Sequence, residues 1–104
     1  KNLFTQLLSG DSVDNISGLE AVTEEVWGKY QLKGRSNSVG IRNAEKLLSD
    51  CNTIEEIRER VEGLYKEYYT EQGKDWKEEF QRQYQLLALM TEKNKIPEYN
   101  FLLN

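Results

Sequence analysis

The sequence predicts an all-α domain of about five helices, and three observations indicate this fold class. Apolar residues recur every three or four positions in several segments, as they do along the buried stripe of a helix. Thr53 followed three residues later by Glu56 has the pattern of a capping box, which marks a helix start. No segment shows the alternation of a half-buried strand. Charged residues make up 31% of the 104 residues and hydrophobic residues 38%, a balance typical of a folded domain.

Five segments fit helices when the chain is taken in order. The expected helices are residues 1–9, 22–30, 42–49, 54–69 and 76–91. Thr23 and Asp75 are the expected caps of the second and fifth helices. Gly73 ends the fourth helix, and aromatic residues on the last two are expected to pack against each other.

Two segments between helices are expected to be irregular. Gln31 to Ser38 is rich in Gly, Ser and Asn and should form an exposed loop. Pro97 ends regular structure near the C-terminus, and the tail beyond it should fold back on the core through Phe101 and Leu102.

The first motif, residues 10–19 (GDSVDNISGL), is here named the aspartate turn. Asp11 and Asp14 lie three residues apart beside glycines, so a near-helical backbone would direct both carboxylates to one point. A hard cation such as Mg²⁺ or Mn²⁺ prefers such oxygen ligands. The alternative is that both aspartates simply cap turns. A calcium-binding loop is excluded, because its invariant glycine would fall on Ile16 and its glutamate on Val22.

The second motif, residues 38–48 (SVGIRNAEKLL), is here named the glycine segment. Val39 and Gly40 precede a strong helix-forming run, so backbone N–H groups at the helix start are available to an anion such as phosphate. Arg42 and Lys46 lie four residues apart on one face, where both could follow a DNA backbone. The alternative is an ordinary helix start with solvated charges.

A local basic region lies inside a chain whose net charge is −4. Residues 27–46 carry five basic side chains and one acidic one, whereas the segments on either side are acidic. Lys33 and Arg35 are therefore further candidates for DNA binding, unless the cluster arose by chance. Trp27 and Tyr30 interleave with these bases as in a single-strand stacking platform, although aromatics at helical spacing more often belong to a core.

Composition excludes several classes of site. The chain has no histidine, so a histidine base is absent, and the single cysteine, Cys51, can form neither an internal disulfide nor a Cys/His zinc site. No apolar run approaches the roughly 20 residues that span a bilayer, and no signal peptide opens the chain. We therefore expect no membrane partner and a cytoplasmic location, in the host cell if the gene is phage-encoded.

The aspartate turn and the glycine segment, in this order, resemble the helix-three-turn-helix region of the structure-specific 5′ nucleases. The family pattern is G-D-x-x-D-N-I-x-G-[LIV] followed by G-[IV]-G-x-[KR]-x-A-x-K-L-L, and nearly every position is present. The family includes flap endonucleases, the 5′ nuclease domain of bacterial DNA polymerase I and bacteriophage 5′-3′ exonucleases. The resemblance is greatest to the phage branch and covers most of the chain.

The resemblance implies a helix-hairpin-helix, SAM-like C-terminal subdomain of such a nuclease. Residues 1–9 would end a helix of the preceding nuclease domain, 10–50 would bind DNA with an insertion at about 20–37, and 51–104 would form a helical pair and tail. In the family, the glycine hairpin grips phosphates of duplex or branched DNA and often holds a monovalent cation such as K⁺. Ser38 replaces the first glycine of that hairpin, which puts the cation site in doubt.

The resemblance also implies that Asp11 and Asp14 are ligands of the second of two magnesium ions. The remaining ligands would come from an N-terminal nuclease domain. This segment alone therefore contains no complete catalytic site and should not cut DNA. Two other functions stay open: a non-catalytic helix-hairpin-helix DNA-binding module, and a helical protein-interaction domain whose basic region meets an acidic partner.

Overall fold

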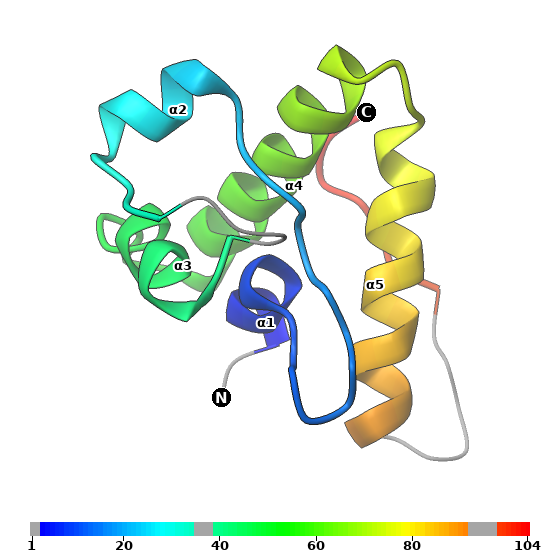
Figure 1. Ribbon diagram of the computed structural model, residues 1–104. Coiled ribbons are helices and arrows are strands. Elements are labelled where there is room, and N and C mark those ends of the chain that lie inside the picture. The colour runs from blue at the N-terminus through cyan, green and yellow to red at the C-terminus, as the bar shows by residue number, and fades with distance from the viewer. Residues whose placement is uncertain (1–2, 35–38, 92–97) are drawn as a thin grey trace.

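The computed structural model describes residues 3–34, 39–91 and 98–104, and these ranges contain five α-helices (Figure 1). No strand occurs in them, and an isolated bridge between Asp11 and Ile16 is their only β-type pairing. The prediction of an all-α domain is therefore confirmed. The helices are α1 (Leu3–Ser9), α2 (Glu24–Lys29), α3 (Ile41–Leu47), α4 (Ile54–Glu71) and α5 (Trp76–Thr91). Among these elements, none is long and apolar enough to cross a membrane.

Helix α1 lies at the centre of the molecule and packs against α3, α4 and α5 (Figure 1). Leu7 and Leu8 have no exposed surface, and the Tyr65 hydroxyl of α4 donates a hydrogen bond to the Leu7 carbonyl oxygen. Helix α1 is thus part of the core that this chain builds itself. Its place at the end of a preceding nuclease domain stays a prediction.

Helices α4 and α5 form an antiparallel pair whose boundaries follow local signals. The Thr53 hydroxyl accepts a hydrogen bond from the Glu56 N–H at 3.1 Å and the Glu56 carboxylate accepts one from the Thr53 N–H at 3.0 Å, which confirms the capping box. Gly73 follows α4 with a φ of 76°, and the Asp75 carboxylate caps α5 through the Lys77 N–H. Between the helices, the rings of Tyr65 and Phe80 meet edge to face at 4.9 Å, as expected of the aromatic residues.

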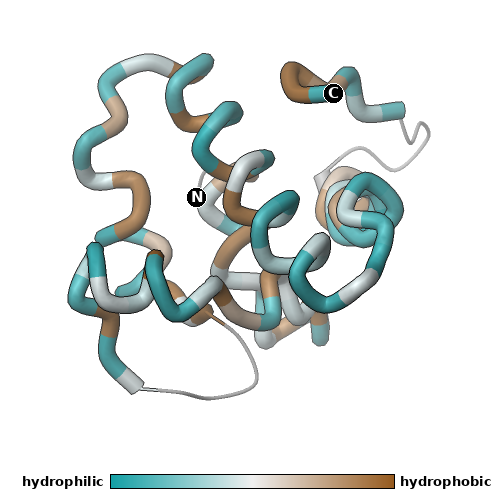
Figure 2. Tube along the Cα trace, turned by 90° about the horizontal axis from the view of Figure 1, so that it is seen from above, coloured by the Kyte–Doolittle hydropathy of each residue, from teal (hydrophilic) through white to brown (hydrophobic). Residues whose placement is uncertain are grey.

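The C-terminal tail, residues 98–104, runs along the back of α4 and α5 (Figures 1 and 2). Tyr99 is buried, and its ring lies 4.6 Å from that of Phe80 and 4.9 Å from that of Phe101. The expectation that Phe101 anchors the tail is correct, but the expectation for Leu102 is wrong, since Leu102 is 39% exposed. Tyr99 takes that place. Pro97 lies outside the described residues.

Glu62 is a fully buried carboxylate that holds the tail to α4. It accepts hydrogen bonds from the Tyr99 hydroxyl at 2.6 Å and from the N–H groups of Leu102 and Leu103 at 2.8 to 3.0 Å. Burial, and secondly the hydrogen bond to Glu62, raise the pKa of Tyr99 to about 12. Arg58 adds a hydrogen bond to the Tyr99 hydroxyl and another to the Asn100 carbonyl oxygen. A buried charge is tolerated here because donors surround it.

Helix α2 is capped by Thr23 as predicted and stands apart from α4 and α5 (Figure 1). Trp27 and Tyr30 are partly buried and pack against the core. This is the core role that was the alternative to a single-strand stacking platform. Of the predicted loop from Gln31 to Ser38, the Leu32 side chain is buried, so the expectation of full exposure is wrong there. Residues 35–38 lie outside the described ranges.

Candidate nucleic-acid interface

The aspartate turn is a closed loop held by contacts between backbone segments. Gly10 and Gly18 have φ angles of 73° and 72°. A Cβ atom on Gly10 would lie 2.3 Å from the Ile16 carbonyl oxygen, and one on Gly18 would lie 2.4 Å from the Gly10 nitrogen. Between them, the Asp11 and Ile16 backbones exchange hydrogen bonds of 2.7 and 2.8 Å. Only glycine fits both positions, because the backbone approaches itself so closely.

The Asp11 carboxylate is engaged within this turn. Its Oδ1 atom accepts hydrogen bonds from the N–H groups of Val13 at 3.1 Å and Asp14 at 3.4 Å, the geometry of an Asx turn. Asp14 is exposed. Over the described residues, no group of three or more Asp, Glu, Cys or His side chains could hold a metal ion. Asp11 and Asp14 are thus two carboxylates without a third, and Asp11 has the capping role that was the alternative to metal binding.

Anchors on both sides fix the turn to the core. Ile16 and Leu19 are buried, and the Leu19 N–H donates to the Leu8 carbonyl oxygen of α1 at 3.2 Å. The Gly18 N–H donates to the Gln83 side chain of α5 at 2.9 Å. The motif therefore serves the fold through its two glycines, Ile16 and Leu19, while the side chains of Ser12, Val13, Asp14, Asn15 and Ser17 are exposed.

The glycine segment has a different local structure. Gly40, with a φ of 82°, is the N-cap of α3 and makes no side-chain capping bond. A Cβ atom at Gly40 would meet nothing within 4 Å, so the space beside it is open. Val39 is buried and its N–H donates to the Leu19 carbonyl oxygen at 3.0 Å, which ties this segment to the aspartate turn. The Val39 carbonyl oxygen also accepts a hydrogen bond from the Asn43 side chain, so both backbone polar groups of Val39 are engaged within the fold.

The predicted basic residues of this region are exposed where the structure describes them. Arg42 and Lys46 extend from α3, and the Lys46 Nζ atom donates to the Gln31 carbonyl oxygen at 3.1 Å. Lys33 is exposed on the preceding loop. Arg35 lies outside the described residues. The contacts described next hold the backbone of Lys33 against α3, the helix that carries Arg42 and Lys46.

Asn43, which was not predicted to have a role, fastens the loop to α3. This buried side chain accepts a hydrogen bond from the Lys33 N–H at 3.2 Å and donates to the carbonyl oxygens of Lys33 at 2.9 Å and Val39 at 3.1 Å. The signal was present in the sequence, because Asn43 shares the buried face of α3 with Ala44 and Leu47.

The two motifs meet at one surface hollow. Asp11, Ser12 and Val13 of the aspartate turn line it together with Ile41, the first residue of α3, and it is completed by Gln6, Ser9 and Gly10. The Asp11 side of the turn and the start of α3 thus face a common space, although they are 30 residues apart in the sequence.

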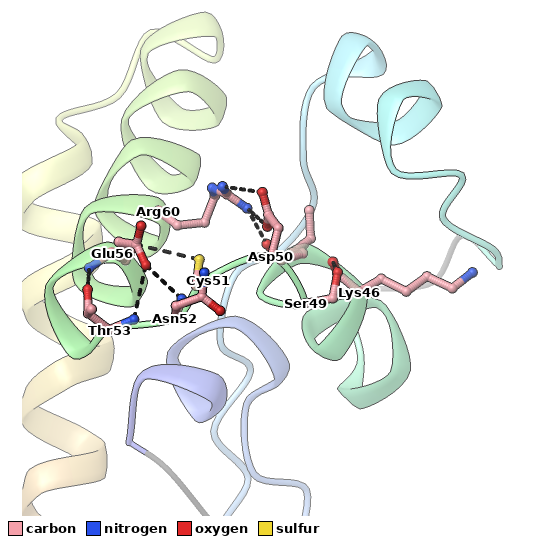
Figure 3. Close-up of polar contacts among 9 residues, drawn as sticks. Lys46, Ser49, Asp50, Cys51, Asn52, Thr53, Glu56 and Arg60 are labelled. Atoms are coloured by element: carbon pink, nitrogen blue, oxygen red, sulfur yellow. Dashed lines mark hydrogen bonds and ion pairs between the residues drawn. The ribbon is translucent and has the colours of Figure 1, made fainter.

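Arg60 of α4 supports the far end of α3 (Figure 3). Its guanidinium donates to both carboxylate oxygens of Asp50, at 2.8 and 3.0 Å, and to the Leu47 carbonyl oxygen at 2.6 Å. The hydrogen bond from Arg60 lowers the pKa of Asp50, and the same bond raises the pKa of Arg60. Arg60 also lies over the Tyr30 ring, 5.5 Å from its centroid. The sequence offered no signal for this pairing across ten residues.

Comparison with protein-family models, with curated proteins and with solved structures finds no match. The likeness to 5′ nucleases therefore rests on the two sequence motifs.

Proposed function

We propose that this chain is the DNA-binding part of a magnesium-dependent 5′-3′ exonuclease or flap endonuclease. The observation that carries the proposal is the shared hollow, which puts the aspartate turn next to the start of α3. A nuclease of this kind needs its metal ligands and its phosphate contacts on the same surface.

Phosphate binding would fall to the glycine segment and the basic residues near it. The open space beside Gly40 lets a DNA backbone approach the main chain closely. Arg42 and Lys46 then supply charge along one face of α3, with Lys33 beside them. Contacts of this kind neutralise phosphates without reading bases, so binding should be independent of sequence and sensitive to salt.

Metal binding would fall to Asp11 and Asp14 in part. Asp11 Oδ1 stabilises the turn, which leaves its other oxygen and the exposed Asp14 carboxylate for Mg²⁺ or Mn²⁺. Two carboxylates do not assemble a two-metal site, so further ligands from a nuclease domain are required and this segment alone should be inactive. A K⁺ ion at the glycine segment belongs to the same proposal.

A non-catalytic DNA-binding module is the second candidate. The Asx turn favours it, because that turn gives Asp11 a structural reason to be acidic without any metal.

Duplex-DNA binding at several salt concentrations tests the part that both candidates share. Replacing Arg42 and Lys46 by alanine should lower affinity about tenfold or more at low salt and reduce the salt slope by about two. The matched control replaces Lys66 and Lys74, which are exposed on and after α4, and should leave affinity nearly unchanged. Equal effects of both pairs, or no binding at low salt, would leave the protein-interaction domain as the remaining alternative.

Metal binding separates the two candidates. Mn²⁺ should broaden the NMR signals of the aspartate turn, and Asp11→Asn with Asp14→Asn should remove the effect while DNA affinity is kept. Joined to a nuclease domain, the chain should then show magnesium-dependent cleavage that the double variant lacks. If Mn²⁺ does not broaden the NMR signals of the aspartate turn, and the chain joined to a nuclease domain does not cleave DNA, the non-catalytic module is supported instead.

A further inference from the structure

A groove runs between α2 and α4 and shares no lining residue with the hollow between the two motifs. It consists of two adjoining hollows of about 480 and 750 Å³, and Glu25, Gly63 and Glu67 line both. Helix α2 does not pack directly on α4 (Figure 1). At one end the gap is bridged by Arg60, whose guanidinium lies over the Tyr30 ring. The rest of the groove is open.

Gly63 in the floor of this groove has no explanation within the fold. It lies in the interior of the 18-residue α4, where glycine is less favourable than alanine or leucine. A Cβ atom at this position would meet nothing within 4 Å, so no neighbour requires its absence. Glycine at such a position is typical of a helix that another chain approaches closely.

The charges around Gly63 are mostly acidic. Glu59 and Glu67 lie four residues before and after it on the same face of α4, and Glu25 lies opposite on α2. All three glutamates are exposed, and no ion pair involves them among the described residues. Seven acidic and three basic side chains line the two hollows, so the groove is acidic on balance. Of the three cations, Arg60 is paired with Asp50, Lys66 donates to the Asn104 carbonyl oxygen, and Lys29 lies 5.6 Å from the centroid of the Tyr30 ring. The groove walls also contain apolar surface from Val26, Leu64 and Leu103.

We propose that this groove binds a basic polypeptide segment of a protein partner, with a lysine or arginine side chain above Gly63. Glu25, Glu59 and Glu67 would neutralise that side chain, and an apolar neighbour would contact the groove walls. Charge complementarity selects this occupant, since a nucleic acid would be repelled and a second copy of this chain carries the same net charge of −4. The inference is independent of the proposed function.

The test uses the 104-residue chain and a synthetic amphipathic peptide of lysine, leucine and alanine of about 14 residues, four helical turns. At low salt, NMR shift changes on titration should saturate and map to α2 and to the Glu59–Glu67 face of α4. The same peptide with glutamate in place of lysine should not bind. No saturable change, or changes spread over the whole surface, would overturn the proposal.

Two triple variants test whether peptide binding is specific to the groove. Replacing Glu25, Glu59 and Glu67 by glutamine should weaken peptide binding about tenfold, the loss expected for three exposed ion pairs. The control replaces Glu55, Glu78 and Glu98 by glutamine, which makes the same charge change outside the groove, and should have little effect. Equal weakening by both triple variants would mean that only net charge attracts the peptide, and would overturn the proposal.

Gly63→Leu tests the close approach directly. The variant should fold with an unchanged or slightly raised thermal midpoint, because leucine favours the helix and its Cβ atom would meet nothing within 4 Å. It should also lose most of its peptide affinity, while Arg42-dependent DNA binding persists. A folded Gly63→Leu chain that binds the peptide as well as the parent would overturn the role of the glycine.

Discussion

Both motifs of this chain contain glycines with positive φ angles, yet these glycines are used in opposite ways. At Gly10 and Gly18 the backbone packs against itself, and an added Cβ atom would lie 2.3 to 2.4 Å from another main-chain atom. At Gly40 the same atom would meet nothing within 4 Å. A sequence pattern does not distinguish these cases. The comparison teaches that the aspartate turn is first a structural element, whereas the glycine segment leaves open space beside Gly40.

The largest loss of stability is expected from substitutions of the two glycines in the aspartate turn. Gly10→Ala or Gly18→Ala should each lower the free energy of unfolding by about 3 kcal/mol, since positive φ adds to a backbone clash. Urea denaturation measures the loss. Stability near that of the parent chain would show that the turn can relax, and the contrast with Gly40 would disappear.

Asn43 should have the next largest effect, because it holds the loop against the glycine segment. Asn43→Ala removes three hydrogen bonds to backbone groups of Lys33 and Val39 and should cost about 1–3 kcal/mol. The exposed Asn100→Ala is the control, with an expected change within about 0.5 kcal/mol. A small loss at Asn43 would mean that the loop is held in other ways.

Alkaline pH should destabilise the contact between α4 and α1 that the Tyr65 hydroxyl makes with the Leu7 carbonyl oxygen. Burial raises the pKa of Tyr65, whose hydroxyl donates to Leu7, well above its ordinary value of 10.0. The stabilisation is complete below pH 10 and is lost as pH rises toward the folded-state pKa. Because the unfolded chain releases this proton first, the free energy of unfolding should fall by up to about 1.4 kcal/mol per pH unit for this group. Tyr65→Phe should reduce that slope in denaturation series above pH 10.

Gly40→Ala should have a smaller effect on stability than either alanine in the aspartate turn. Only backbone strain applies, at about 2 kcal/mol, because φ 82° and ψ 161° is a region used almost only by glycine but no atom obstructs the new methyl group. Duplex-DNA affinity should nevertheless fall if phosphate approaches the main chain there. A variant that keeps full DNA affinity would remove Gly40 from the proposed interface.

Asp11→Asn should have the smallest effect on stability, within about 0.5 kcal/mol. The amide oxygen of asparagine can accept the same hydrogen bonds from the N–H groups of Val13 and Asp14. Asp11→Ala cannot, and should cost about 1 kcal/mol more by thermal denaturation. If asparagine destabilises as much as alanine, the turn requires the negative charge itself.

Local signals made the helices predictable. Thr23, Asp75 and the Thr53–Glu56 pair each act on backbone groups a few residues away, so the sequence contains both partners of every contact. The fourth helix runs two residues further than predicted, to Glu71, which is within the fraying expected at helix ends.

The contacts that could not be predicted join distant parts of the chain. Glu62 meets the tail about 40 residues later, and Arg60 meets Asp50 across a connection between helices. Nothing near either residue in the sequence identifies its partner. The tail shows the consequence, because both Phe101 and Leu102 are apolar, and the hydrogen bonds from the Leu102 and Leu103 backbones to Glu62 leave the Leu102 side chain exposed.

The same carboxylate makes the C-terminal tail a poor place for engineering. A truncation that removes residues 99–104 would strand the Glu62 negative charge inside the molecule, at a cost of several kcal/mol beyond the lost apolar contacts. Fluorophores and affinity handles for the binding assays are therefore better attached through an introduced surface cysteine, for example at Lys74, after replacement of Cys51.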